Sequence, residues 1–172
     1  MKIILDGKEV TAEAGRTILE VARQNGVDIP TLCHVPALEP AAMCRLCTVE
    51  LIENRRSRMV TACNYPLRGD AEVRTDTPLL RQGRKLIVEL LWPSAGGLAH
   101  KLGVERSRFV PELTDCSLCG LCVRYCAEVA KKNVVYFKGR GVDRRIAFVP
   151  ELADECDSCR ACFKLCTGGF VI

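Results

Sequence analysis

The sequence predicts an α+β fold in three parts, and three observations lead to this prediction. Strand, turn, strand and helix signals follow one another near the N-terminus, an amphipathic helix pattern covers residues 77–92, and one cysteine spacing occurs twice in the C-terminal third. We therefore expect a β-grasp domain over residues 1–76, a helical connector over residues 77–106, and a duplicated cysteine-rich module over residues 107–172.

The N-terminal elements are predicted from local signals. Two short β patterns within residues 2–11 flank Asp6-Gly7, a pair that is favoured in tight hairpin turns. Thr17 stands three residues before Glu20, which is the spacing of a capping box, and the helix that it opens should end near residue 25. Two strands, a helix and then a cysteine-bearing loop are the opening of a β-grasp domain.

Four cysteines in and after this loop have the spacing of a cluster site. The pattern is C-x10-C-x2-C with a distant fourth cysteine, at Cys33, Cys44, Cys47 and Cys63. Plant-type [2Fe–2S] ferredoxins use C-x4-C-x2-C and a distant fourth cysteine, so only the first gap is longer here. A strand pattern at residues 48–52 lies between the last two cysteines. We expect a [2Fe–2S] cluster, and zinc is the alternative for these thiols.

The C-terminal cysteines form two identical runs. Each run has the spacing C-x2-C-x2-C-x3-C, which binds [4Fe–4S] clusters, with the fourth cysteine of each run on the other run's cluster. The expected ligands of one cluster are Cys116, Cys119, Cys122 and Cys166. Those of its partner are Cys156, Cys159, Cys162 and Cys126. The three sets use all twelve cysteines, so no thiol is left for catalysis or for a disulfide.

The duplication extends beyond the cysteines. Phe-Val-Pro-Glu-Leu precedes both runs, at residues 109–113 and 148–152. Between the runs, β patterns at residues 134–137 and 146–149 predict a hairpin, and residues 170–172 can form a last short strand. Two half-modules that each give three ligands to one cluster and one to its twin explain this repeat.

The connector begins with the clearest helix pattern. Thr77 is its cap and Pro78 lies in its first turn. Its apolar residues, at three- and four-residue steps, are Leu79, Leu80, Gly83, Leu86, Ile87, Leu90 and Leu91. We expect this stripe to be buried between the N- and C-terminal domains, and the face with Arg81, Arg84 and Lys85 to be solvated.

The composition is that of a protein whose thiols are ligands. Twelve cysteines in 172 residues must be disulfides or metal ligands. The N-terminus reaches Asp6 and Gly7 too early for an export signal, and no apolar run is long enough to span a membrane. We therefore expect a cytoplasmic protein without a membrane span.

The net charge of +4 gives little support for nucleic-acid binding. Cysteines that ligate iron are thiolates, so three bound clusters would bring the net charge to about −2. No basic run interleaved with aromatic residues occurs, and there is no phosphate loop, dinucleotide fingerprint or flavin motif. The chain's own chemistry is therefore expected to be one-electron transfer, without catalysis by the chain alone.

Longer motifs surround the first four cysteines. They are Pro-Thr-Leu-Cys-His at residues 30–34, Cys-Arg-Leu-Cys-Thr-Val-Glu at 44–50, Thr-Ala-Cys at 61–63 and Thr-Asp-Thr-Pro at 75–78. They resemble the N-terminal ferredoxin domain of three groups. These groups are the largest peripheral subunit of respiratory complex I, the diaphorase gamma subunit of NAD-linked hydrogenases, and electron-transfer subunits of bifurcating hydrogenases and formate dehydrogenases. With both C-terminal runs, the resemblance covers nearly the whole chain.

The chain departs from this family in the connector. Relatives usually carry His-x3-Cys-x2-Cys-x5-Cys there, which holds a further [4Fe–4S] cluster. Aligning His100 with that histidine puts Val104, Ser107 and Leu113 at the three cysteine positions. The resemblance therefore implies three clusters, with His100 an ordinary helix or loop residue. Electrons would then pass from the [2Fe–2S] site to a [4Fe–4S] site directly or through another subunit.

The resemblance also implies a place in a larger complex. The sequence ends six residues after Cys166, which favours a separate subunit of an NAD-linked [NiFe] hydrogenase. We expect it to relay electrons between a hydrogenase small subunit and a flavin/NAD-binding diaphorase subunit, with soluble ferredoxin as a further partner if electron bifurcation occurs. An electron-transfer subunit of a formate dehydrogenase or another NADH-dependent complex is one alternative. A free-standing soluble ferredoxin is a second.

Four basic residues stand within or beside the cysteine motifs: Arg45, Arg124, Arg160 and Lys164. Positive charge there would favour the reduced, more negative state of a cluster. The same residues can also be solvated surface charges or docking contacts.

Overall fold

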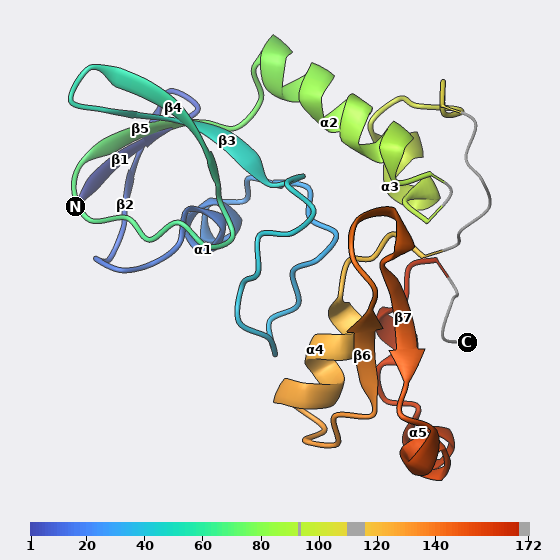
Figure 1. Cartoon of the computed structure of the whole chain (residues 1–172). Coiled ribbons are helices and arrows are strands. Elements are labelled where there is room, and N and C mark those ends of the chain that lie inside the picture. The colour runs from blue at the N-terminus through green and yellow to red at the C-terminus, as the bar shows by residue number, and fades with distance from the viewer. Residues whose placement is uncertain (93, 110–115, 169–172) are drawn as a thin grey trace.

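The computed structural model describes residues 1–92, 94–109 and 116–168, and its N-terminal part is a mixed β-sheet (Figure 1). The strands are β1 (Lys2–Leu5), β2 (Lys8–Thr11), β3 (Thr48–Glu53), β4 (Arg56–Thr61) and β5 (Ala71–Arg74). Their order in the sheet is β2-β1-β5-β3-β4. Strands β1 and β5 are parallel, and the other neighbours are antiparallel.

The core of this part lies between the sheet and helix α1 (Ile18–Gln24). Side chains alternate along each strand, so one face of the sheet is buried. That face contributes Ile3, Leu5, Val49, Leu51 and Val73, which form one cluster with Ile18, Leu19 and Val21 of α1. Cys47 and Cys63 belong to the same buried cluster, so two predicted ligands are fixed directly by the core.

The first hairpin and α1 form as predicted. The Thr17 hydroxyl accepts a hydrogen bond from the Glu20 backbone N–H at 3.2 Å, and the Thr17 N–H donates to the Glu20 carboxylate at 2.8 Å. Asp6 and Gly7 have φ angles of 48° and 83°, as a tight type I′ turn requires. This α+β arrangement agrees with the ferredoxin-type N-terminal domain that the sequence predicts.

Two helices follow the sheet: α2 (Pro78–Leu90) and α3 (Gly96–Lys101). Thr77 caps α2, because its hydroxyl accepts a hydrogen bond from the Leu80 N–H at 3.3 Å. Among the described residues, no helix is long and apolar enough to cross a bilayer.

Helix α2 buries only part of the predicted apolar stripe, a part that includes Leu80. Leu79, Leu86 and Leu90 are 63%, 41% and 60% exposed, so the prediction of a fully buried apolar stripe is wrong for these three residues. Arg84, which we expected on the solvated face, is only 6% exposed. The Arg84 guanidinium reaches backbone carbonyls in the loop that carries Cys44 and Cys47, and Leu80 and Val88 are buried on the same face of the helix.

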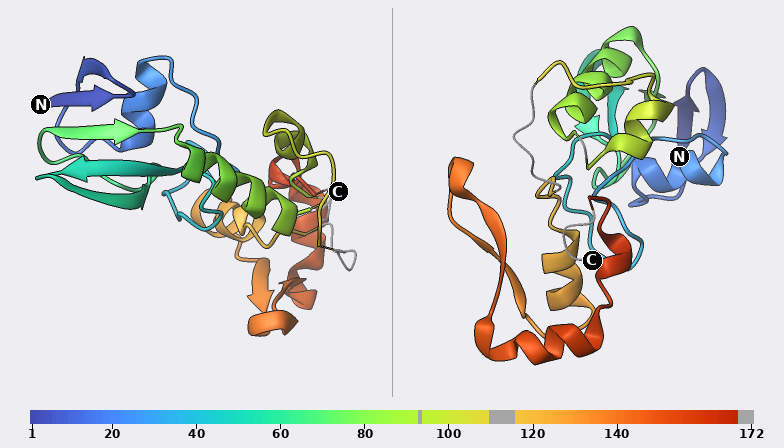
Figure 2. Two further views of the ribbon diagram at one scale, coloured as in Figure 1. Left: turned by 90° about the horizontal axis from the view of Figure 1, so that it is seen from above. Right: turned by 90° about the vertical axis from the view of Figure 1, so that its right-hand side faces the viewer.

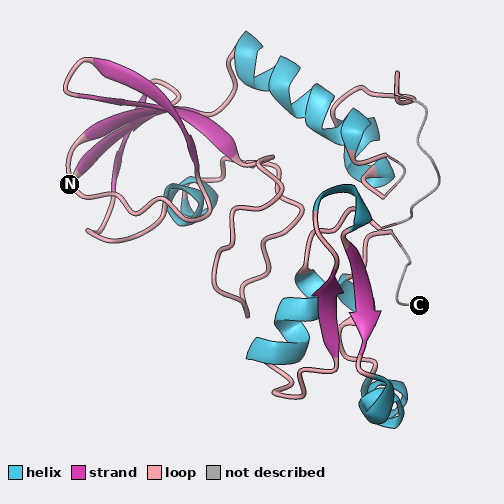
Figure 3. Ribbon diagram, viewed as in Figure 1, coloured by secondary structure: helices cyan, strands magenta, loops and turns pink. Residues whose placement is uncertain are grey.

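The C-terminal part packs a helix against a two-stranded sheet (Figure 3). Its elements are α4 (Leu121–Glu128), β6 (Val135–Lys138), β7 (Arg145–Phe148) and α5 (Ala153–Cys159), with short 3-10 turns at Gly141–Asp143, Pro150–Leu152 and Phe163–Leu165. Strands β6 and β7 pair antiparallel, which confirms the predicted hairpin. The strand predicted at residues 170–172 and most of the repeat segment at residues 109–113 lie outside the described residues.

Helix α2 and one long loop connect the two parts. The views in Figure 2 show α2 running from the sheet toward the C-terminal part. The loop between Cys33 and Cys44 extends away from the sheet toward α4, and Glu39 in this loop contacts α4 directly (Figure 1). The domain boundaries after residues 76 and 106 stay predictions.

Candidate iron–sulfur cluster sites

The first candidate site gathers Cys33, Cys44, Cys47 and Cys63. Cys33, Cys47 and Cys63 are buried, and Cys44 is half-buried. The Cys44 backbone N–H donates a hydrogen bond to the Cys33 sulfur at 3.4 Å. The thiols influence one another's pKa in two pairs, Cys33 with Cys44 and Cys47 with Cys63. The four residues are therefore brought together by the structure.

The contacts within each pair shift the pKa values of the two thiols in opposite directions. A hydrogen bond from the Cys33 thiol lowers the pKa of Cys44 to about 5, and one from Cys63 lowers the pKa of Cys47 to about 7. The same bonds raise the pKa of Cys33 and of Cys63, because each of these thiols must keep its proton to donate it. A cluster needs four thiolates, so iron would replace the two remaining protons.

The backbone around this site is shaped to face an anion. Ala42 and Arg45, on either side of Cys44, have left-handed φ angles of 52° and 60°. Left-handed residues in a loop turn successive N–H groups toward one side, and such concavities bind anionic groups, including iron–sulfur clusters. The Leu46 N–H helps to lower the pKa of Cys44 in this way.

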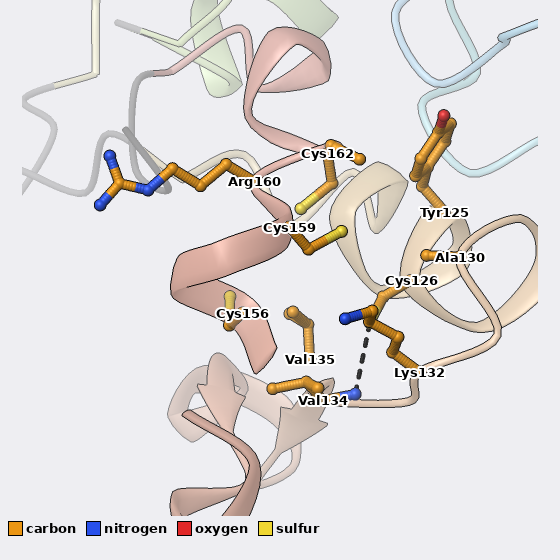
Figure 4. Close-up of a pocket in the computed structure, with 11 residues that line it drawn as sticks. Tyr125, Cys126, Ala130, Lys132, Val134, Val135, Cys156, Cys159, Arg160 and Cys162 are labelled. Carbon is orange, nitrogen blue, oxygen red and sulfur yellow. Dashed lines mark hydrogen bonds between the residues drawn. The ribbon is translucent and has the colours of Figure 1, made fainter. Parts of the chain in front are cut away.

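The second candidate site is a hollow lined by Cys116, Cys119, Cys122 and Cys166. The third is a hollow lined by Cys126, Cys156, Cys159 and Cys162 (Figure 4). These groupings are the ones that the spacing predicts, including the exchange of the fourth cysteine between runs. All twelve cysteines are free of disulfide bonds. The roles of these cysteines as cluster ligands stay predictions.

Both hollows have an apolar lining around their thiols. Ala130, Val134 and Val135 surround the cysteines of the third site, and the Val134 N–H donates to the Cys126 sulfur at 3.3 Å (Figure 4). Arg160 extends away from these cysteines and is exposed. Burial raises the pKa of Cys122 to about 12 and also raises the pKa of Cys162. These thiols are therefore protonated unless a metal takes the place of the proton.

The two runs share a backbone feature. Gly120 and Arg160, each directly after the second cysteine of its run, have left-handed φ angles of 73° and 43°. Leu118, inside the first run, is also left-handed, with φ of 53°. Thus each of the three sites contains left-handed residues next to its cysteines. Sets of four thiols, apolar surroundings and inward N–H donors together fit iron–sulfur clusters.

Across the described residues, no group of three or more His, Cys, Asp or Glu side chains converges on the position of one metal ion. In a [4Fe–4S] cluster each thiolate binds a different iron atom, and in a [2Fe–2S] cluster each iron binds two thiolates. The four thiolates of a cluster site therefore need not converge on one point. Zinc would need four ligands around a single ion, and it stays the alternative to a cluster for the first site.

The first and second sites are neighbours. Met43 and Cys44 line one cavity together with Ser117, Leu118 and Cys119. The same cavity is also lined by Ile87, Leu90 and Leu91 of α2. A Cβ atom built on Gly120 would lie 3.3 Å from the Met43 sulfur, which shows how closely the loop of the first site approaches the second.

Polar contacts join helix α4 to the loop of the first site. The Arg124 side chain of α4 donates to the Glu128 carboxylate at 3.0 Å and also to the Glu39 carbonyl in the loop of the first site. The Glu39 N–H donates back to Glu128 at 3.3 Å. Arg124, which the sequence offered as a cluster-tuning charge, a surface charge or a docking contact, therefore makes a contact between the two parts of this chain.

Apolar side chains pack around the connector residue Val104. Val104, at one cysteine position, is buried against Leu46, Val88 and Ala99. His100 lies on α3 and is exposed, as expected for an ordinary helix residue. Ser107 is used as a hydrogen-bond donor to the Glu89 carbonyl at 2.8 Å, and Leu113 lies outside the described residues.

The fold of residues 1–78 and the grouping of the cysteines are similar to those of ferredoxin-type iron–sulfur proteins. Residues 1–78 match the family described as 2Fe-2S iron-sulfur cluster binding domain. The chain is 28% identical, over 98% of its length, to a subunit of an NADH-quinone oxidoreductase from Rhizobium meliloti. It is also 28% identical, over its full length, to the HndD subunit of the NADP-reducing hydrogenase from Solidesulfovibrio fructosivorans. It spans only 23% and 36% of these two relatives.

A solved structure shows the same relationship. A crystal structure of an NAD+-reducing [NiFe]-hydrogenase in the H2-reduced state contains a similar chain, with a TM-score of 0.75 and 26% sequence identity. The similarity covers 86% of the present chain and 74% of the other. The chain is therefore an iron–sulfur protein related to subunits of NADH-quinone oxidoreductases and NAD(P)-linked hydrogenases, and the resemblance that the motifs indicate is confirmed.

One buried charged residue was missed by reasoning from sequence. Arg84 touches the loop of the first site although it lies 38 and 36 residues away from the carbonyls that it binds. No spacing rule links it to the cysteines. Only its position four residues after Leu80 and four before Val88, both buried, could have indicated that it faces inward.

Proposed function

We propose that this chain is the iron–sulfur electron-transfer subunit of a multi-subunit NAD(P)-linked [NiFe] hydrogenase. It relays electrons between a hydrogenase small subunit and a flavin/NAD-binding diaphorase subunit. The observation that carries the proposal is the gathering of all twelve cysteines into three groups of four, in a chain that resembles subunits of such enzymes. A cytoplasmic location is part of the proposal.

When bound, one [2Fe–2S] and two [4Fe–4S] clusters supply one-electron carriers. Cys33, Cys44, Cys47 and Cys63 hold the first; Cys116, Cys119, Cys122 and Cys166 hold the second; Cys126, Cys156, Cys159 and Cys162 hold the third. The chain's residues bind iron through thiolates, exclude water with apolar side chains and offset thiolate charge with backbone N–H donors. No residue of the chain is assigned a catalytic role.

Transfer between the first and second sites is direct in this proposal. The cavity that Cys44 and Cys119 line together supports this route, because it places the two loops next to each other. The apolar packing of Val104 with Leu46 and Val88 supports the absence of an intermediate site in the connector. Soluble ferredoxin enters the proposal as a further partner only if the complex bifurcates electrons.

Two alternatives belong to different assemblies. The relatives among NADH-quinone oxidoreductase subunits favour a second candidate, an electron-transfer subunit of a formate dehydrogenase or another NADH-dependent complex. A free-standing soluble ferredoxin is the third. The exposed row of Leu79, Leu86 and Leu90 on α2 favours a subunit over a free carrier, because a carrier gains nothing from a wide apolar surface.

Purification of the native protein under anaerobic conditions tests the proposal. We expect the chain to elute with nickel and flavin in fixed ratio, in a fraction that reduces NAD(P) with hydrogen. Elution with molybdenum or tungsten in place of nickel would favour the formate dehydrogenase alternative. A stable monomer that carries electrons between separate enzymes would overturn the subunit assignment.

A further inference from the structure

Arg84 of α2 is a buried cation held against the loop of the first site. Its Nε donates to the Leu46 carbonyl at 3.1 Å, and its Nη2 donates to the Thr48 carbonyl at 2.8 Å. These two carbonyls belong to the residues on either side of Cys47. The guanidinium is therefore fixed beside a predicted ligand by two hydrogen bonds from another element of the fold.

This cation has no carboxylate partner within the described part of the chain. Glu89, the other buried charged residue of α2, forms an ion pair with Arg108 at 2.7 Å, whereas Arg84 takes part in no ion pair there. Burial of an unpaired charge is costly, and two neutral carbonyls offset only part of that cost. Arginine also stays protonated when buried, so the positive charge persists.

Three acidic groups surround Arg84, and one of them is Cys47 of the first site. Asp76, Cys47 and Asp6 are the acidic groups whose charge acts on Arg84, and Asp76 already forms an ion pair with Arg81 at 2.7 Å. The Asp6 carboxylate accepts two hydrogen bonds from Thr75, at 2.7 and 2.6 Å. Both carboxylates therefore have other partners, and Cys47 is the remaining acidic group that acts on Arg84.

We propose that Arg84 is the counter-charge of the first site and raises the reduction potential of the cluster held there. This inference rests on the proposed presence of a [2Fe–2S] cluster at that site. An electron that enters the site adds one negative charge, and a fixed positive charge in a medium of low dielectric constant stabilises that added charge. Arg84 acts through position and charge and is not itself a ligand.

The alternative role is purely structural. Arg84 could act only as a clip that ties α2 to the loop and β3. Lysine keeps the charge but cannot make both hydrogen bonds in the same geometry. Methionine and glutamine remove the charge, and glutamine keeps a donor for one carbonyl. Lys85, the exposed neighbour of Arg84 on α2, provides a matched control for loss of one positive charge.

The test is a redox titration of the purified full-length holoprotein, followed by the electron paramagnetic resonance signal of the reduced [2Fe–2S] cluster. We expect Arg84→Met and Arg84→Gln to shift the midpoint potential to lower values, with unchanged iron content. Arg84→Lys should stay close to the wild type, and Lys85→Met should match it. A wild-type potential in both neutral variants would overturn the proposal, and so would equal shifts in Arg84→Lys and Arg84→Met.

Loss of the cluster in the variants is also informative. If both neutral variants lose iron from this site while Arg84→Lys retains it, charge is what the site requires, and the proposal stands. If Arg84→Lys loses it as well, the role is structural and the proposal fails. A wild-type protein without a [2Fe–2S] signal would instead contradict the proposed function, so the two failures are distinct.

Discussion

At the scale of single residues, Gly120 shows how closely the two parts of the chain approach each other. It has a left-handed φ of 73°, and a Cβ built on it would lie 3.0 Å from Phe137 and 3.3 Å from the Met43 sulfur. A side chain here would therefore meet atoms from both parts. Gly141 has a φ of 55° and nothing within 4 Å of such a Cβ, which makes it the matched control.

We expect Gly120→Ala to lower stability more than Gly141→Ala. Both substitutions carry the cost of a left-handed alanine, roughly 1–2 kcal/mol. Only Gly120→Ala adds a close contact, which costs about 1 kcal/mol more. Urea unfolding of the two variants measures the difference. Equal losses would mean that Met43 and Phe137 do not pack on Gly120 in solution.

The cysteine groups could be predicted from the sequence before the fold was known, whereas the role of Arg84 could not. Spacing predicts the sets of four because the ligands of a cluster follow a local sequence rule, apart from one distant cysteine. Arg84 follows no such rule, since its acceptors at Leu46 and Thr48 belong to a different element. Its burial depends on contacts with other elements, and the spacing of apolar residues along a helix does not predict such contacts.

At the scale of elements, the loop between Cys33 and Cys44 joins the first site to α4. Arg124, Glu128 and the Glu39 backbone form a closed set of hydrogen bonds there. The first gap of the cysteine pattern is longer than in plant-type ferredoxins, and the added residues make this contact. The longer gap between Cys33 and Cys44 thus allows this loop to contact α4.

We expect Arg124→Met to loosen this loop. Hydrogen bonds to charged groups contribute about 1.5–3 kcal/mol, so the Glu39 amide should exchange with solvent at least about tenfold faster. Hydrogen exchange followed by mass spectrometry measures this change. Arg45→Met, at an exposed position beside the same loop, should leave the rate unaltered. An unchanged rate in Arg124→Met would show that the loop is held by other contacts.

Elements with local signals were predictable, and those that depend on distant pairing were not. The hairpin of β1 and β2 and the capping box of α1 follow from a few adjacent residues. Strand β5 has only four residues and pairs with β1 and β3, both distant in sequence, so its pattern is too short to predict it. The exposed leucines of α2 show the same limit, because which face of that helix is buried depends on contacts with distant residues such as Leu46.

At the scale of the whole molecule, the exchange of cysteines between the two runs links the halves of the C-terminal part. Cys126 lines the hollow of the second run, and Cys166 lines the hollow of the first. Each half is therefore expected to be incomplete without the other. The iron content of double cysteine variants should therefore differ from that expected if each run held its own cluster.

We expect iron loss to follow the exchanged sets. Cys126→Ala combined with Cys156→Ala should remove a single [4Fe–4S] cluster and leave about six irons per chain. Cys126→Ala combined with Cys116→Ala should remove both and leave about two. Iron analysis of the two double variants, with the visible spectrum as a check on the remaining clusters, decides the matter. The reverse order of iron contents would mean that each run keeps its own fourth cysteine.

The central claim is that this chain holds one [2Fe–2S] and two [4Fe–4S] clusters and no other metal. Iron, zinc and acid-labile sulfide measured on the anaerobically purified wild-type chain test it most directly. The account predicts about ten irons and about ten sulfides per chain, without zinc. About eight irons with one zinc would contradict the assignment of the first site. About fourteen irons would show a further cluster that the apolar packing around Val104 is inferred to exclude.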